Sequence, residues 1–131
     1  MVELLEAETV MRQVGYAAAF SPDCKTVATG GYVDEEHAVK LWEVATGKEC
    51  AVLKGLANEY MTSVVFSPDG KSLAAGCGGT IGVWDVPTGK LLATLKGHKS
   101  DIWSLAFRSD GKILAAGGEK TIKLWDLASG K

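Results

Sequence analysis

The sequence predicts an all-β protein made of three similar units, each a small sheet of short antiparallel strands. Two sets of aromatic residues recur at a spacing of 41 to 46 residues: Phe20, Phe66 and Phe107, and Trp42, Trp84 and Trp125. Such a spacing is typical of a repeat architecture. Between these landmarks, short apolar runs alternate with turns rich in Gly, Pro, Asp and Ser, a pattern that favours strands over helix faces.

Composition narrows the class of protein further. The 131 residues are 47% hydrophobic and 23% charged, which is typical of a soluble globular domain. With a net charge of -2 the chain has no overall attraction for nucleic acid or anionic lipid, so we expect neither partner. No apolar run approaches the roughly 18 residues of a membrane span, and residues 1–6 lack the basic and apolar regions of a signal peptide. We therefore expect a cytoplasmic protein.

The first element is the N-terminal segment near residues 2–8. Its apolar spacing resembles that of residues 90–95, which we expect to be an outer strand, and it could complete the third unit of a partner chain. Because Glu, Leu and Ala also favour helix, a helix is the alternative for this segment.

The three units follow as residues 13–54, 55–96 and 97–131. The third shows the pattern most clearly, with strands expected at 102–107, 113–117 and 121–125 and a glycine-containing turn at 108–111. Residues 90–95 then form the fourth strand of the second unit. We expect the glycine-rich stretch 76–80 to be a tight turn, because it lacks the lysine and the following helix of a phosphate-binding loop.

These units resemble the WD40 repeat family. The Gly-His dipeptide of that family is present as Gly97-His98, and its Trp-Asp dipeptide as Trp84-Asp85 and Trp125-Asp126; Trp42 holds the same place in the first unit. Two Ser-Pro-Asp turns, at 21–23 and 67–69, recur in register with them. The resemblance implies that each unit is a four-stranded blade of a WD40-type β-propeller.

The sequence departs from the family pattern in its polar network. Members of the family often link a histidine, a strand hydroxyl, a turn aspartate and the tryptophan by hydrogen bonds. No unit here has all four: the first offers Thr29, Glu36 and Trp42 without the histidine, and the second offers Trp84 alone. We therefore expect packing, rather than these networks, to hold the blades together.

Three blades are too few for a closed ring, which uses about four to eight. We expect a homodimer in which a second copy completes a six-blade ring. The alternative is a piece of a longer natural or designed propeller, since 129–131 end where an outer strand should begin.

Residues suited to catalysis or metal binding are few. His98, Ser100 and Asp101 are too close along the chain to form a hydrolytic triad, and the acidic run beside His37 is typical of a solvated loop. Cys24, Cys50 and Cys77 have no disulfide or metal-clamp spacing, and we expect free thiols that pack as small apolar residues. The sequence predicts no enzyme, no metal and no cofactor.

The remaining function is recognition by surface. The resemblance implies a non-catalytic scaffold that binds a protein or peptide on the narrow loop face of the propeller. Tyr and Trp are enriched at binding hot spots. Candidates for this face follow from alignment on the three phenylalanines. Four residues before each phenylalanine lie Tyr16, Thr62 and Trp103, and two residues earlier lie Tyr60 and Asp101. Glu35, in the loop of the first unit, is the charged candidate. Alternatively Trp103 and Tyr16 pack between blades, and the chain is a self-assembling propeller fragment with no dedicated partner.

Overall fold

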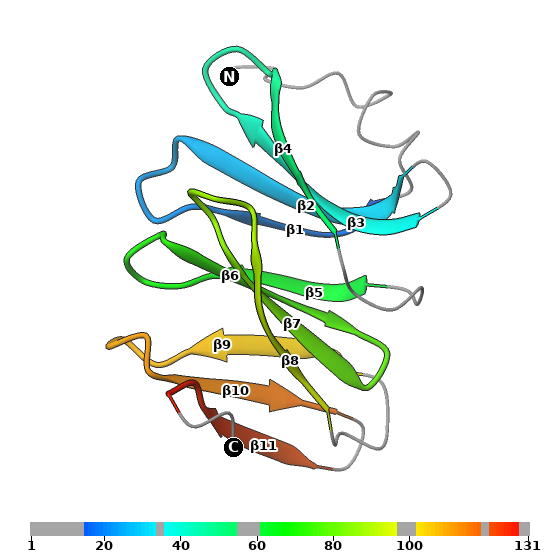
Figure 1. The fold of residues 1–131 in the computed structure, drawn as a ribbon, viewed down its shortest axis with the longest axis vertical. Coiled ribbons are helices and arrows are strands. Elements are labelled where there is room, and N and C mark those ends of the chain that lie inside the picture. Colours follow the sequence, from blue (N-terminus) through cyan, green and yellow to red (C-terminus); the bar gives the residue numbers. More distant parts are fainter. Residues whose placement is uncertain (1–14, 34–35, 55–60, 97–101, 119–120, 129–131) are drawn as a thin grey trace.

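The fold consists of strands joined by turns. The computed structural model describes residues 15–33, 36–54, 61–96, 102–118 and 121–128, and every structural statement below concerns these residues. They form eleven β-strands in three antiparallel sheets and contain no helix (Figure 1). Accordingly, no helix capable of crossing a membrane occurs in these ranges.

Each sheet is a meander whose strands follow one another in chain order. Sheet 1 contains β1 (Gly15–Phe20), β2 (Thr26–Val33), β3 (Glu36–Glu43) and β4 (Glu49–Leu53). Sheet 2 contains β5 (Met61–Phe66), β6 (Ser72–Cys77), β7 (Thr80–Asp85) and β8 (Leu91–Leu95). Sheet 3 contains β9 (Ser104–Phe107), β10 (Ile113–Gly117) and β11 (Ile122–Asp126).

The predicted four-stranded antiparallel blade is therefore present in sheets 1 and 2. Sheet 3 has three strands in the described part of the chain, in the order β11-β10-β9. The N-terminal segment 2–8, expected to supply a fourth strand, lies outside the described residues. The predicted tight turn is confirmed, since Cys77 ends β6, Thr80 begins β7, and Gly78 has a φ of 61°.

A side-chain hydrogen bond holds the hairpin turn that follows the first strand of sheets 1 and 2. In sheet 1 the Ser21 hydroxyl donates to Asp23 Oδ1 at 2.6 Å, and the Lys25 amide donates to the same oxygen at 2.9 Å. Ser67 and Asp69 repeat the first of these bonds, also at 2.6 Å, in sheet 2. Because the aspartate takes up amide and hydroxyl donors within the turn, the Ser-Pro-Asp sequence fixes the hairpin locally.

The fourth residue of this turn lies in the left-handed region of backbone conformation. Gly70 and Gly111 have φ values of 74° and 73°, which glycine adopts without steric cost. In sheet 1 the equivalent residue is Cys24, whose φ is 62°. A side chain there costs energy that the other two turns avoid.

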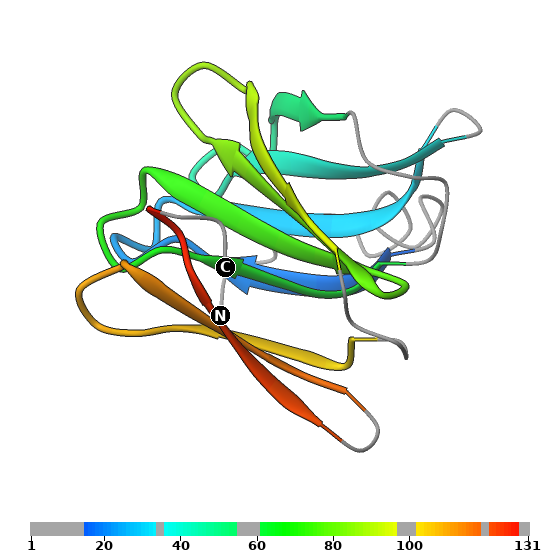
Figure 2. The ribbon, with the colours of Figure 1, turned by 60° about the horizontal axis from the view of Figure 1, so that its bottom comes forward.

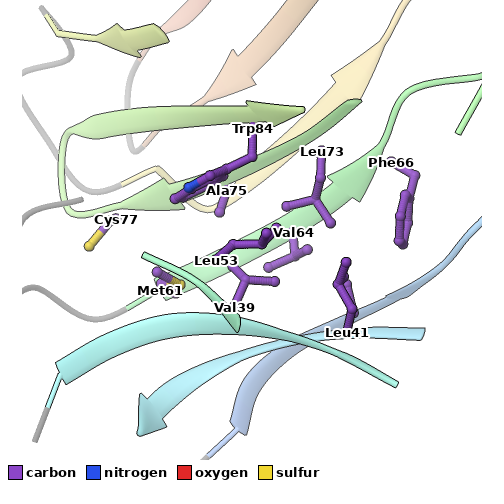
Figure 3. Packing of buried hydrophobic residues seen from close by; sticks show 11 residues of the cluster. Val39, Leu41, Leu53, Met61, Val64, Phe66, Leu73, Ala75, Cys77 and Trp84 are labelled. Atoms are coloured by element: carbon purple, nitrogen blue, oxygen red, sulfur yellow. The ribbon is translucent and has the colours of Figure 1, made fainter. Parts of the chain in front are cut away.

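The sheets lie face to face in chain order, with sheet 2 between the other two (Figures 1 and 2). Their first strands, β1, β5 and β9, lie next to one another. A hydrophobic core fills each of the two joints. The joint between sheets 1 and 2 contains Val39, Leu41 and Leu53 from sheet 1 and Met61, Val64, Phe66 and Trp84 from sheet 2 (Figure 3). The joint between sheets 2 and 3 contains Ile81, Val83, Leu95, Ile102, Leu105 and Leu114.

Two glycines let neighbouring sheets approach closely. A Cβ on Gly30 would lie 3.0 Å from Val64 Cγ2, and a Cβ on Gly76 would lie 3.0 Å from Ile102 Cγ2. Both distances are too short for ordinary packing, so each glycine forms a notch. The notch at Gly30 receives Val64 of sheet 2, and the notch at Gly76 receives Ile102 of the segment that enters sheet 3.

Candidate interaction edge

Among the predicted aromatic partner-binding residues, Trp103 is the one whose side chain lies in the described part of the chain. It directly precedes β9, and 61% of its surface is exposed. Its own amide donates to the Gly117 carbonyl at 2.9 Å, and the amide of Ile102 donates to the Gly78 carbonyl at 2.8 Å. The backbone is therefore fixed to the hairpin ends of two sheets while the indole faces solvent. We call this end of the sheets, with Gly78, Trp103 and Gly118, the Trp103 edge.

Thr62 lies at the position in sheet 2 that Trp103 holds beside sheet 3. Its side chain is half-buried, and its hydroxyl donates to the carbonyl of Ile102. That bond joins sheet 2 to the segment entering sheet 3. Thr62 therefore fixes the backbone next to Trp103, a role that the sequence pattern did not reveal.

The other predicted binding residues are not placed by the structure as contacts. Tyr16 lies near the start of β1, where only its backbone is described. Glu35, Tyr60 and Asp101 lie outside the described residues. Their grouping with Trp103 thus stays a prediction.

The three signature tryptophans differ in their hydrogen bonds. Trp42 Nε1 donates to Thr29 Oγ1 at 2.9 Å, so the part of the polar network that the first unit retains is formed. Trp84 is fully buried, and its Nε1 donates to the Lys54 carbonyl at 2.9 Å. Trp125 Nε1 is buried without a hydrogen-bond partner in the described part of the chain. A buried unpaired donor is costly, so the Trp125 indole lacks the stabilisation that hydrogen bonds give to the indoles of Trp42 and Trp84.

The aspartates of the Trp-Asp dipeptides organise the turns that follow. Asp85 Oδ2 accepts from the Thr88 amide at 3.1 Å, and Asp126 Oδ1 accepts from the Ala128 amide at 3.0 Å. Gly97 and His98 lie outside the described residues.

Carboxylates at the opposite edge are bound within their own turns. Hydrogen bonds from Ser21 and Ser67 lower the pKa values of Asp23 and Asp69 below the ordinary range. The Arg108 guanidinium, bonded to Asp110 at 2.6 Å, lowers the pKa of that carboxyl to about 2. These groups are ionised at neutral pH and already paired, which suits turn stabilisation rather than proton transfer.

Two of the three thiols are not packed as predicted. Cys77 is buried, but Cys24 and Cys50 are exposed and line one pocket of about 510 Å³ beside Val44 and Ala45. All three are free. Cys24 is exposed because it lies in a turn at the position where the other units carry glycine, a signal that alignment of the three turns could have provided.

No group of three or more metal-ligating side chains occurs among the described residues. The features that the structure brings together are an anchored, exposed tryptophan and two apolar sheet faces, described below. Such features suit binding to another macromolecule.

The family comparison agrees with this geometry. The family model for the WD domain, G-beta repeat, matches residues 47–85 and 89–126, which is more than half of the chain. Each match begins near the last strand of one sheet and continues through three strands of the next. A comparison with curated proteins found no significant match.

Proposed function

The chain belongs to the WD40 repeat family, and from this premise we propose that it is a scaffold that binds a protein or peptide at the Trp103 edge. WD40 repeats generally act as non-catalytic interaction scaffolds. The observation that carries the proposal is the combination of a 61% exposed Trp103 with a backbone bonded to two sheets. A segment whose backbone is held in place before binding loses little backbone entropy when a partner covers it.

The arrangement around Trp103 supports a peptide-sized ligand. The Gly78 and Gly117 carbonyls hold the segment between two hairpin ends, and the half-buried Thr62 bonds its Ile102 carbonyl. A partner therefore meets one aromatic anchor on a surface of small hairpin residues. Tyr16, Tyr60, Asp101 and Glu35 complete the proposed contact surface on the same narrow loop face.

In this proposal the units 13–54, 55–96 and 97–131 act as blades, and a second copy of the chain completes a six-blade ring. The setting is the cytoplasm, and the partner is neither nucleic acid nor membrane. No cofactor takes part, because the proposed role is binding alone.

The test is selection of peptides from a random display library against the purified chain, followed by calorimetric titration of the enriched peptides. Trp103→Ala should weaken their binding by roughly 30-fold or more, the effect of losing a hot-spot side chain. Leu92→Ala is the matched control, because Leu92 is 59% exposed on β8 and away from this edge. Peptides that bind the Trp103→Ala variant as tightly as the parent would refute the assignment.

A second candidate is a self-assembling propeller fragment with no dedicated partner. It is favoured by the apolar faces at both ends of the stack, where Phe20, Ile122 and Leu124 are exposed. This candidate predicts rings of the pure chain and no enriched peptides in the same selection.

A further inference from the structure

The two joints inside the chain use equivalent positions, which allows the free faces at the ends of the stack to be compared with them. β11 corresponds to β3 and β7. Ile122 is the counterpart of Val39 and Ile81, which are fully buried against the next sheet, and yet Ile122 is 77% exposed. Leu124, the other apolar residue on that side of β11, is 66% exposed. In the described part of the chain, sheet 3 therefore presents one half of a joint with no sheet packed against it.

The glycine notch recurs on the same face. Gly117 is the counterpart of Gly30 and Gly76, whose notches receive Val64 and Ile102. A Cβ on Gly117 would meet nothing closer than Ser104 Cβ, at 3.9 Å. The notch of sheet 3 is thus formed and open.

Sheet 1 presents the opposite half of a joint. Phe20 is the counterpart of Phe66, which is buried between sheets 1 and 2, and of Phe107, which packs between sheets 2 and 3. Phe20 itself is 60% exposed. The chain therefore carries both complementary halves, one on each end.

The hairpin turns indicate which molecule supplies the missing half. Within the chain, a proline of one turn lies against the glycine of the next: Pro22 Cδ would be 3.5 Å from a Cβ on Gly70, and Pro68 Cδ 3.8 Å from one on Gly111. In the turns that face the free ends of the stack, neither the proline nor the glycine of these contacts is present. Sheet 3 has Ser109 in place of the proline, and sheet 1 has Cys24 in place of the glycine.

Serine is smaller than the proline that it replaces, and cysteine is larger than the glycine that it replaces, so the two changes compensate if Ser109 and Cys24 meet. We propose that the free face of sheet 3 binds the free face of sheet 1 of a second copy, with Phe20 packed against Leu124 and Cys24 against Ser109. Such a head-to-tail joint closes when two copies meet twice. The proposal specifies the contact surface of the ring closure proposed above and rests on it.

Besides the turns, this joint differs from the internal ones at the glycine notch. The notch at Gly30 receives Val64, which lies two residues before Phe66, whereas the notch at Gly76 receives Ile102 from further up the chain. Ala18 lies two residues before Phe20, and it is too small to fill the notch at Gly117 as Val64 fills the one at Gly30. The joint between copies is therefore less tightly packed than those within the chain. We expect the ring to dissociate into single chains before the sheets themselves separate.

The first experiment is a disulfide trap. Ser109→Cys is combined with Cys50→Ser, oxidised at micromolar concentration and analysed on a non-reducing gel, with Cys24→Ser added as the control. We expect a covalent species of two chains that depends on Cys24 and is lost on reduction. Cross-linking that persists without Cys24, or a ladder of longer species, would overturn the closed head-to-tail joint.

The second experiment measures solution mass by light scattering. Ile122→Lys should weaken dimerisation by roughly 100-fold, about tenfold at each of the two joints, whereas Leu92→Lys should not. Ala18→Val should tighten the dimer by filling the notch. A dimer that tolerates Ile122→Lys would refute this joint, and a concentration-independent monomer would refute ring closure as well. Peptide binding at Trp103 is measured separately and can survive either result.

Discussion

Gly76→Ala tests whether the close approach of sheets 2 and 3 depends on the notch at that position. The new methyl group would lie 3.0 Å from Ile102 Cγ2 and 3.2 Å from Ile102 Cβ. Ile102 cannot easily move away, because it is fully buried and its amide donates to the Gly78 carbonyl at 2.8 Å. The substitution must therefore push the two sheets apart or strain the isoleucine.

The magnitude follows from two opposing effects. Overpacking a well-packed core costs about 1–3 kcal/mol, while replacing glycine by alanine within a strand recovers about 0.5–1 kcal/mol. The free energy of unfolding should fall by about 1–2 kcal/mol. With a urea slope of about 2 kcal/mol/M, in the middle of the range for small proteins, the midpoint should fall by roughly 0.5–1 M.

The matched control is Gly117→Ala, at the equivalent position of sheet 3. Its methyl group would meet only Ser104 Cβ at 3.9 Å, so stability should be unchanged or slightly higher. Both variants and the parent are unfolded in urea at one protein concentration and followed by tryptophan fluorescence. Equal midpoints for Gly76→Ala and Gly117→Ala would show that the notch does not govern sheet packing.

Two further predictions concern the tryptophans and the acidic turns. Trp84→Phe should lower the free energy of unfolding in urea more than Trp125→Phe does, because Trp84 loses its hydrogen bond to the Lys54 carbonyl and the Trp125 indole has no such bond to lose in the described part of the chain. Equal losses in the two variants would contradict this. Hydrogen bonding to Arg108 lowers the folded-state pKa of Asp110 to about 2. The ionised Asp110 carboxylate therefore stabilises the fold above about pH 4, and this stabilisation is lost as pH falls toward 2. Asp110→Asn should therefore reduce the loss of thermal stability across that range, whereas a parallel decline in parent and variant would exclude the pair as a cause.

The fold could be read from the sequence because its determinants are local. The turn Arg108–Gly111 and the apolar run after it delimit β10 at Ile113–Gly117, as predicted. Strand starts that depend on distant partners were less accurate. The strand expected from Ile102 begins at Ser104, because the Ile102 amide bonds the Gly78 carbonyl of sheet 2 instead of a strand of sheet 3.

The candidate site was harder to predict because it also depends on contacts between residues that are distant in the sequence. Alignment on the phenylalanines selected Trp103, which is exposed, but it could not show that the Thr62 hydroxyl is bonded to the Ile102 carbonyl. Nor does alternation along β11 reveal that Ile122 faces away from the core. Exposure of an apolar residue depends on whether a further sheet follows, and this is a property of the assembly rather than of the strand.

The offset between sequence repeat and sheet has a consequence for how such chains change in length. The matched segment 47–85 starts in the turn before β4 of sheet 1 and ends at the last residue of β7 in sheet 2. A duplication or deletion of one such segment cuts two sheets rather than separating them. Each inserted copy supplies the outer strand that completes its predecessor's sheet and leaves its own sheet to be completed by its successor. Gene rearrangement can therefore add or remove a blade while every joint keeps the same pair of faces.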